Sequence, residues 1–553
     1  MWFFKNHNGL ANLDSTINTW NIVLFALPLL LFLPVIYYSM ATPFALVDDY
    51  GMCYFVEFLD NSKRFSNWLH RQVLDFSYGR YRPFFDFYNM VSWKFFGATP
   101  WLHHLTRWFM HFTSIGFFAA SFVIIARDKA NKGFLVSGEN QTRSILIPLG
   151  VLIYIWLFFP NVPAARLGPQ EVFTVFFLGL CNLMLALIII QGSKEQRTLS
   201  TLFYYVLFYA GYLGLSVSKE INIAVMLWIV MFYFGLLCRG WSWKKIFAGL
   251  PLLLIFFYTL KKIFIASNNN YYGVEPLTFE LITDNLKWIS KDLFQSQISI
   301  FITTAFIVLL LFLLFACINQ LIKRQVDNEL IYIVLIAGEL ISLYLILTTS
   351  WAKVLRYWYV ILPVFTMILA FSARSALEVT RKNYPVLNRV SAIALSSFVI
   401  YFIGCNYYNF LLQSVAQHSL RQAEAELINE VSKLHDQEHY IYILVDKTDP
   451  DAELLYHLVA YYRNFSPRFH GKKYMVHTSP PEKPDQPYYV ITRRTQPGNQ
   501  SIHKYIIPQS EYTLLNYAYG LSSLFQQKKP LETKDAGVHN ISRYEWIIYS
   551  HRS

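Results

Sequence analysis

Long apolar segments recur through residues 20–412 and constrain this chain more than any other feature of its sequence. A helix that crosses a lipid bilayer needs about 20 mainly apolar residues, and about eleven segments approach or exceed that length. With 55% hydrophobic and 15% charged residues, a water-soluble chain of 553 residues would have too little polar cover. An α-helical polytopic membrane protein with about eleven transmembrane helices is therefore predicted. The predicted spans are Trp20–Ala41, Trp101–Ala126, Ser144–Phe159, Gln170–Gln191, Thr201–Val217, Ile221–Cys238, Ile246–Ala266, Ile298–Asn319, Glu329–Leu347, Trp358–Ala373 and Val390–Leu412.

Basic residues alternate between the two sides of this topology. Lys and Arg are enriched in the loops that stay in the cytoplasm. If the N-terminus is cytoplasmic, the cytoplasmic connections are RDKANKGFLVSGENQTR, GSKEQR, CRGWSWKK, IKRQ and RSALEVTRKNYPVLNR, and each is basic. The first long loop, 42–100, and the C-terminal part then lie outside. The net charge of +12 includes these basic loops, so no nucleic-acid partner is expected.

The composition changes near Gln413. QSVAQHSLRQAEAELINEVSKLHD has helical apolar spacing, whereas YIYILV and YYVITR are short β-branched and aromatic runs bounded by polar or Pro-rich turns. We predict two domains, a transmembrane domain over 1–412 and a C-terminal extracytoplasmic α/β domain over 413–553. The second has no glycine-rich phosphate loop and no nucleophile elbow, so it is expected to cover the membrane part, to hold an acceptor or to be purely structural.

Cysteine usage indicates neither a disulfide framework nor a zinc site. Four of the five cysteines lie in or beside apolar runs, none forms a CxxC pair, and the polar C-terminal part has none. The first apolar run is too long for a cleavable signal peptide and is interpreted as a retained membrane span. Localisation in a bacterial inner membrane is expected, with the N-terminus in the cytoplasm.

The first outer loop carries the most informative charges. Asp48 and Asp49 follow the first span directly, and Arg80 and Arg82 alternate with aromatic residues further on. Between them, FSNWLHRQVLDFSYG predicts a helix lying in the membrane interface. Each charge alone is also compatible with a wet loop. The residues expected near one face of that helix are Phe65, Trp68, Leu69, Val73, Leu74 and Phe76.

Several further charges abut the spans on the predicted outer side. Ionisable groups at such positions are costly and usually face a cavity or a charged partner. An ion pair, such as Lys219 with Glu220 or Arg166 with Glu171, would be a purely structural explanation. Snorkelling would account for Lys261 and Lys262. The charges concerned are Arg166, Glu171, Lys219, Glu220, Lys353 and Arg356.

Three histidines near the start of the second span, His103, His104 and His111, could bind a metal by spacing alone. No HExxH or similar motif accompanies them, so they are interpreted as hydrogen-bonded histidines at the membrane interface.

The order of these features resembles the GT-C superfamily of integral membrane glycosyltransferases, which take sugars from polyprenyl phosphate carriers. The resemblance covers roughly residues 20–412, with an outer C-terminal domain as in several members. It is carried by the following motifs: VDDY (Val47–Tyr50), GRYRP (Gly79–Pro83), GPQE (Gly168–Glu171), SKE (Ser218–Glu220) and LRYWYVILP (Leu355–Pro363).

The resemblance implies an inverting transfer to an extracytoplasmic acceptor, which could be a glycan, a lipid or a protein. The first-loop acid of the family maps to Asp48, with Asp49 as a neighbour or co-base, and a carboxylate there would take the acceptor hydroxyl proton. Fixed cations would bind the donor phosphate, and Glu171 and Glu220 could serve as further acids or bind the acceptor. The phosphate-binding candidates are Arg80, Arg82, Lys219, Lys353 and Arg356. Some members of the superfamily use a metal, but with no DxD in the first loop no metal or other cofactor is expected.

Three other classes fit parts of the pattern. A transporter or flippase of a lipid-linked saccharide would use the same cations to hold phosphate and would need no base. An O-antigen polymerase or ligase usually has its large outer loop late in the chain, so the early acidic loop argues against it. A scaffold would not account for charges at the span ends.

Overall fold

The structure is a computed structural model of the chain. It describes ten longer segments, five strands and some single positions between them. The segments are 19–42, 56–75, 82–129, 139–157, 170–192, 199–237, 243–267, 327–350, 355–383 and 389–401. The strands are 440–444, 474–477, 488–492, 501–505 and 546–551, and the single positions are 280, 283, 284, 311, 314, 317, 318, 386, 403, 404, 407, 411, 414 and 418.

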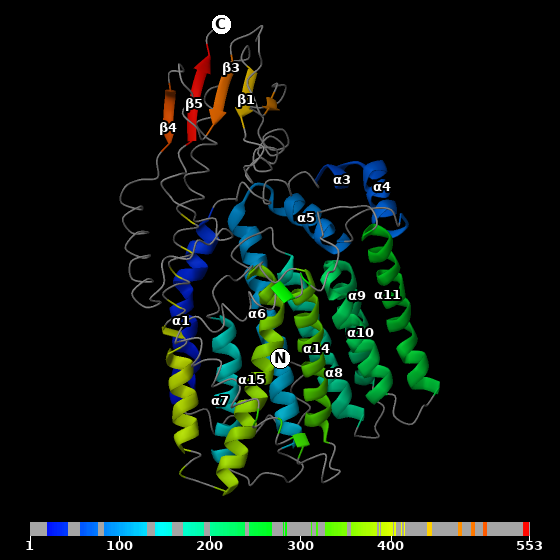
Figure 1. The fold of residues 1–553 in the computed structure, drawn as a ribbon, viewed down its shortest axis with the longest axis vertical. Coiled ribbons are helices and arrows are strands. Elements are labelled where there is room, and N and C mark those ends of the chain that lie inside the picture. The colour runs from blue at the N-terminus through cyan, green and yellow to red at the C-terminus, as the bar shows by residue number, and fades with distance from the viewer. Residues whose placement is uncertain are drawn as a thin grey trace.

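Roughly parallel helices form a bundle (Figure 1). Most residues of its helices are apolar, as expected of helices that are buried or surrounded by lipid. They are α1 (Thr19–Ala41), α6 (Pro100–Lys129), α7 (Glu139–Leu157), α8 (Glu171–Gly192), α9 (Leu199–Ser218), α10 (Ile223–Phe232), α11 (Trp243–Ser267), α14 (Asn328–Ser350) and α15 (Leu355–Asn383). A single 3₁₀ turn, η6 (Glu220–Asn222), precedes α10, and a π-helical turn, η7 (Tyr233–Leu237), follows it.

Helix α8 occupies the middle of the bundle and packs against α6, α9, α14 and α15. Small residues permit its close approach to α9, as they do between membrane helices generally. A Cβ atom on Gly214 would lie 2.2 Å from the ring of Phe177, so this contact requires glycine. The central side chains of the core, such as Phe118, Trp156 and Tyr332, are fully buried.

Six described helices are long and apolar enough to cross a membrane, and four shorter apolar helices accompany them in the described part of the chain. The chain is an integral membrane protein. The predicted count of eleven spans is not confirmed by this number, and most of the predicted span Ile298–Asn319 lies outside the described residues. Helices α6 and α15 both continue past their predicted ends, to Lys129 and Asn383.

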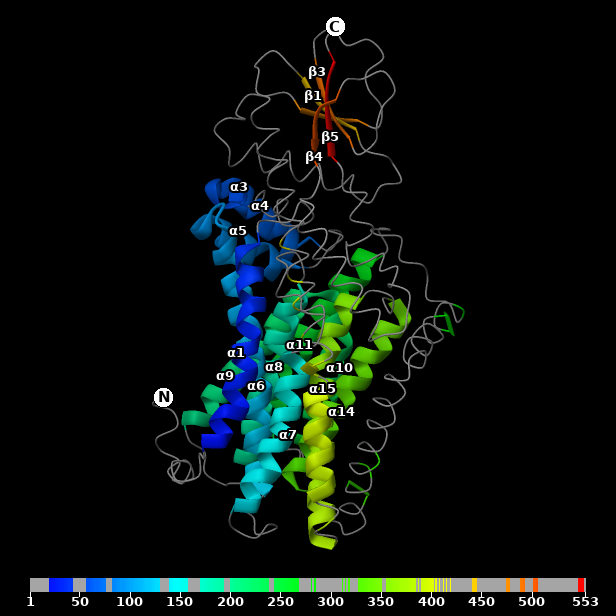
Figure 2. The same cartoon turned by 90° about the vertical axis from the view of Figure 1, so that its left-hand side faces the viewer.

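Three helices lie at one end of the bundle rather than within it: α3 (Val56–Asp60), α4 (Ser62–Val73) and α5 (Pro83–Phe96). Figures 1 and 2 show all three at the end where α6 begins. We call this the α5 end and the opposite one the Lys129 end. The helix predicted to lie in the interface is α4, and the sidedness predicted from the basic loops would place the α5 end outside.

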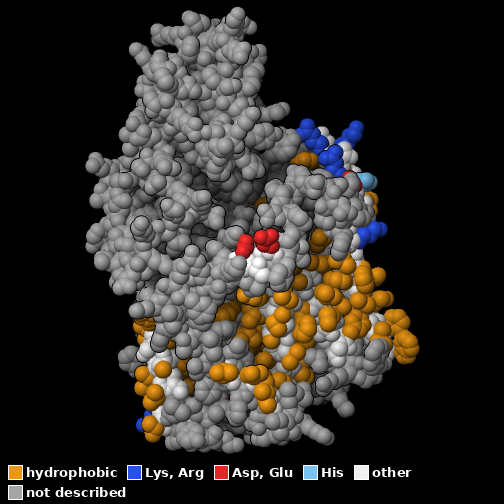
Figure 3. Space-filling view, viewed as in Figure 1, with side chains coloured by type: hydrophobic (Ala, Val, Ile, Leu, Met, Phe, Trp, Pro, Cys, Tyr) orange, Lys and Arg blue, Asp and Glu red, His pale blue; other side chains and the backbone are white. Residues whose placement is uncertain are grey.

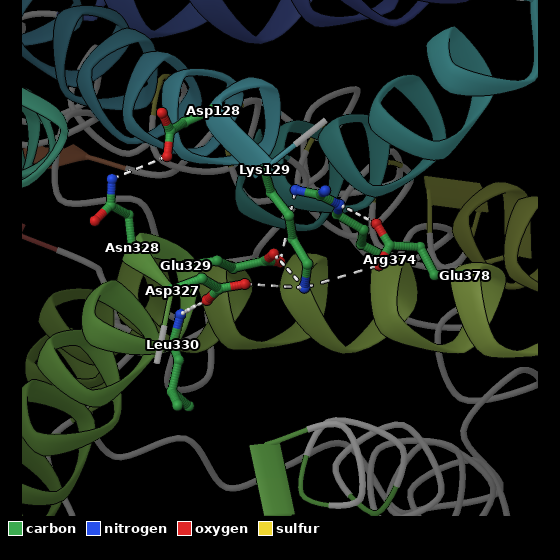
Figure 4. Close-up of polar contacts among 8 residues, drawn as sticks. All are labelled: Asp128, Lys129, Asp327, Asn328, Glu329, Leu330, Arg374 and Glu378. Carbon is green, nitrogen blue, oxygen red and sulfur yellow. Dashed lines mark hydrogen bonds and ion pairs between the residues drawn. The ribbon is translucent and has the colours of Figure 1, made fainter. Parts of the chain in front are cut away.

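Charged side chains join three helices at the Lys129 end (Figure 4). The Nζ atom of Lys129 on α6 lies 2.8 Å from Glu329 of α14, 3.6 Å from Asp327 and 4.0 Å from Glu378 of α15. The buried Arg374 of α15 reaches Glu329 at 3.6 Å and Glu378 at 2.7 Å. These ion pairs fix where α6, α14 and α15 meet, and removing one partner would unbalance the charges of a buried network.

Five strands of the C-terminal segment form one mixed sheet in the order β2-β1-β3-β5-β4. β1 pairs in parallel with β2 and β3, whereas β5 pairs antiparallel with β3 and β4. Figures 1 and 2 show the sheet beyond the α5 end. The runs YIYILV and YYVITR supply β1 and β3, but the helices of the predicted α/β domain lie outside the described residues. The strands are β1 (Tyr440–Leu444), β2 (Tyr474–His477), β3 (Tyr488–Thr492), β4 (Ser501–Tyr505) and β5 (Trp546–His551).

Candidate functional site

Buried polar side chains gather in the bundle near the α5 end. Arg107 is 1% exposed and lies seven residues from the start of α6, about 10 Å along the helix axis. Its guanidinium carbon lies 4.3 Å from the ring centroid of Phe173 on α8 and 5.2 Å from that of Tyr88 on α5. Cation–π contacts of this kind are strongest where water is excluded. Arg107 therefore places a fixed positive charge inside the α5 end.

An ion pair between Glu171 and Lys219 lies in the same region. The Lys219 ammonium donates to Glu171 Oε1, and the two side chains are 4% and 1% exposed respectively. Glu171 is the first residue of α8 and Lys219 directly follows the last residue of α9. The negative Glu171 thus lies at a helix N-terminus, where the partial charge of the helix is positive. The positive Lys219 lies at a helix C-terminus, where that partial charge is negative.

Asn222 holds the turn that carries Lys219. Its Nδ2 donates to Leu215 O at 2.9 Å and to Thr174 Oγ1 at 3.2 Å. These bonds join the end of α9 to the first turn of α8 around the ion pair. The position of Lys219 is therefore set by a fully buried amide as well as by its own charge.

Three histidines of α6, His103, His104 and His111, are buried at or below 3% exposure. His103 Nε2 lies 3.0 Å from Gly97 O, and His111 Nδ1 lies 2.6 Å from the Tyr359 hydroxyl. His104 differs, because neither of its ring nitrogens has a hydrogen bond of ordinary geometry to the described residues. The backbone of Thr42 lies beside its ring. Among the described residues, no group of three potential metal ligands occurs.

The structure brings some of the predicted site residues together. Glu171 and Lys219 form an ion pair with each other, and Tyr359 lies within electrostatic reach of Glu171 and Arg107. The two pairs considered from the sequence involve Arg166 and the Glu220 side chain, which lie outside the described part of the structure. Arg82 is the N-cap residue of α5, at the same end of the bundle. Glu220 and Arg356 belong to η6 and α15, but their side chains lie outside the described atoms. Asp48, Asp49, Arg80 and Lys353 lie outside the described residues.

Arg107 was not among the predicted site residues, and the contact between His104 and Thr42 was not predicted. Arg107 stands inside the predicted span Trp101–Ala126, where an ionisable residue is by itself a sign of a functional or paired group. That sign was available from the sequence. The contact of His104 with Thr42 was not, because it depends on how α1 packs against α6.

A second buried carboxyl lies deeper in the bundle. Glu339 of α14 is fully buried, and Asn182 Nδ2 of α8 donates to its Oε2 atom at 3.0 Å. The Tyr332 hydroxyl lies 3.5 Å from Asn182 Oδ1. Among the described residues, Glu339 forms no ion pair, and its Oε1 atom has no hydrogen bond. This cluster is separate from the ion pair at the α5 end.

Comparisons with known proteins give structural neighbours only. No protein-family model matches the chain, and no curated protein sequence matches it. Two solved structures of ArnT from Cupriavidus metallidurans, a GT-C glycosyltransferase, are similar in fold at 12% sequence identity. The apo structure has a TM-score of 0.46, the one bound to undecaprenyl phosphate has 0.45, and each comparison covers 97% of this chain and 98% of the other.

Proposed function

We propose that this chain is an inverting glycosyltransferase that moves a sugar from a polyprenyl-phosphate-linked donor to an extracytoplasmic acceptor. Asp48 is the base in this proposal, with Asp49 as its neighbour. The observation that carries it is the cluster of Arg107, Glu171 and Lys219, buried near the α5 end of an otherwise apolar bundle.

The cluster suits a donor with an apolar lipid part and an anionic head group. A polyprenyl phosphate has a long apolar chain and a charged head group, so its site needs lipid-exposed apolar surface beside fixed cations. Arg107 and Lys219 supply cations at the level of the α5 end, and arginine is suited to bidentate contact with phosphate. Ionisable groups in a membrane domain usually mark a substrate path.

The segment that leads to the predicted acidic pair begins beside this cluster. Thr42 is the last described residue after α1, and its backbone lies beside His104, three residues before Arg107 on α6. Asp48 follows Thr42 by six residues, which span at most about 20 Å when fully extended. Asp48 is therefore within reach of a sugar whose phosphate is held near Arg107.

The proposed chemistry is a single displacement. The Asp48 carboxylate takes the proton of the acceptor hydroxyl while that oxygen attacks the anomeric carbon. The bond from the anomeric carbon to the phosphate oxygen breaks, and the lipid phosphate leaves with the electron pair. Fixed cations stabilise the charge that grows on this phosphate. Attack opposite the leaving group inverts the anomeric centre.

The decisive experiment is Asp48→Asn in the full chain, reconstituted in vesicles with lipid-linked sugars extracted from host membranes. Transfer should fall about 10²- to 10⁴-fold, because asparagine cannot take the proton. Binding of polyprenyl phosphate should be unchanged. Asp60→Asn is the matched control, since Asp60 is an exposed acid of α3 whose carboxylate pairs with Lys94. A wild-type transfer rate in Asp48→Asn would disprove the assigned base.

A transporter or flippase of a lipid-linked saccharide is the second candidate, favoured by the buried Glu339. Carboxyl groups inside membrane helices commonly form proton relays in transporters. In that case Asp48→Asn would still move lipid-linked saccharide across the vesicle membrane, and no glycosylated acceptor would form with the wild-type chain. Both readouts come from the same vesicles.

A further inference from the structure

Helix α4 carries cations along most of its length and no acid. Its sequence is SKRFSNWLHRQV, and the Asn61 side chain caps it by accepting from Lys63 N at 3.0 Å and Arg64 N at 3.2 Å. The cap satisfies backbone donors that the first turn cannot pair by itself. The helix is therefore well defined although it lies outside the bundle.

The inner side of α4 is attached to the protein. Trp68 is 7% and Gln72 1% exposed, and Gln72 Nε2 donates to Asp86 Oδ2 of α5 at 3.0 Å. From α11, the Tyr258 hydroxyl donates to Val73 O, and Lys262 Nζ donates to Asp75 O at 2.8 Å. These contacts with α5 and α11 fix the rotation of α4 about its axis.

The remaining surface of α4 divides into an apolar and a basic stripe. Leu69 and Val73 are 45% and 40% exposed and share one stripe, four residues apart. Lys63 and His70 are exposed about a quarter of a turn further round, and Arg71 is exposed about another quarter of a turn beyond them. We call these three residues the basic stripe. Around its axis, the helix thus has one side packed against the protein, then an apolar side, then a basic side.

The apolar and basic stripes lie in the same order as the acyl chains and the head groups of a membrane surface. Figure 3 shows basic side chains gathered at the edge of the molecule where α4 lies, above a broad band of hydrophobic side chains. On α11, which contacts the end of α4, Leu254 and Phe257 are 63% and 59% exposed. The apolar stripe of α4 would continue the band, and the basic stripe would lie at the level of lipid head groups.

We propose that α4 docks on the bilayer surface and that Lys63, His70 and Arg71 bind the phosphate groups of anionic phospholipids. The occupant follows from charge complementarity, because the basic stripe carries no acid and borders lipid-facing apolar side chains. This interaction is independent of the proposed sugar transfer. It would hold the first outer loop at a set depth in the membrane.

The test is native mass spectrometry of the full chain in detergent micelles, titrated with phosphatidylglycerol or with phosphatidylcholine. The wild-type chain should retain phosphatidylglycerol preferentially, and the preference should weaken as salt is raised. Lys63→Gln and Arg71→Gln should each reduce phosphatidylglycerol binding about fivefold, as expected for one basic residue at an anionic surface. Phosphatidylcholine binding should not change.

Lys94→Gln is the matched control, because Lys94 is 52% exposed on α5 but pairs with Asp60. It should leave the lipid preference unchanged. Unfolding temperatures of all variants check that α4 stays in place. Undiminished phosphatidylglycerol binding by the Lys63→Gln/Arg71→Gln double variant would overturn the proposal. A dimer that depends on these two residues would also overturn it, because the face would then belong to a second copy of the chain.

Discussion

Arg107 and Glu339 are both ionisable residues buried in apolar helices, and their surroundings differ. Arg107 lies over the rings of Phe173 and Tyr88 in the cluster near the α5 end. Glu339 lies among neutral polar groups, with the Asn182 amide as its hydrogen-bond donor. An ionised carboxylate without a cation is very costly in such a place, whereas a neutral acid needs only hydrogen bonds. We therefore expect Glu339 to hold a proton in the folded protein.

This expectation leads to a prediction for two Glu339 variants. Glu339→Gln keeps the shape and an acceptor for Asn182, so it should change the free energy of unfolding by less than about 1 kcal/mol. Glu339→Leu leaves the buried amide without that acceptor and should cost about 1–3 kcal/mol. Unfolding in mixed micelles measures both values. Equal and large losses in the two variants would contradict a neutral acid, because glutamine would be as poor a replacement as leucine only for an ionised carboxylate held by a cation. Loss of substrate movement in Glu339→Gln would favour the transporter.

At the scale of elements, the ion pairs at the Lys129 end join α6, α14 and α15. Arg374 is fully buried and Glu329 is 3% exposed, so the pair has little contact with solvent. The two cations of this network, Lys129 and Arg374, belong to segments that were predicted to be basic cytoplasmic loops. Their charges serve helix packing, which explains why α6 and α15 continue past their predicted ends.

Arg374→Met should therefore destabilise the bundle more than a surface substitution would. Removing one partner of a buried ion pair typically costs about 3–5 kcal/mol when the other charge is left uncompensated. Here Lys129 still lies 2.8 Å from Glu329, so the loss should fall towards the lower end of that range. Adding Glu329→Gln to this variant should recover part of the loss, since it removes one of the three acids that then share Lys129 as their cation. A double-mutant cycle on the unfolding free energy gives the coupling. Strictly additive losses would show that Arg374 and Glu329 do not interact energetically.

At the scale of the whole molecule, the two ends of the bundle are predicted to face opposite sides of the membrane. Alkaline phosphatase fused after residue 132, beyond the Lys129 end, should be inactive, because that loop is predicted to be cytoplasmic. Fusion at the C-terminus should be active, because the segment 413–553 is predicted to lie outside. A green fluorescent protein series at the same positions should give the opposite pattern. Activity at both positions would contradict an odd number of spans.

Local composition made the apolar helices predictable, because a run of about 20 apolar residues is itself the signal for a span. The partners in the site could not be found in this way. Glu171 and Lys219 are 48 residues apart, and only the packing of α8 against α9 brings them together. The helix ends beyond Ala126 and Ala373 were missed because charged residues usually end a span, whereas here they find buried partners. Arg107 alone could have been recognised from the sequence.

The Glu171–Lys219 ion pair also affects how an anion could bind. As a unit the pair is neutral, and its members are almost completely enclosed. A phosphate that approached Lys219 would compete with Glu171, and the carboxylate it displaced would be left in a poorly hydrated place. Taking up a proton is the least costly way for that carboxylate to adapt. Binding of polyprenyl phosphate would then draw protons from the buffer, and its calorimetric heat would vary with the ionisation enthalpy of the buffer chosen.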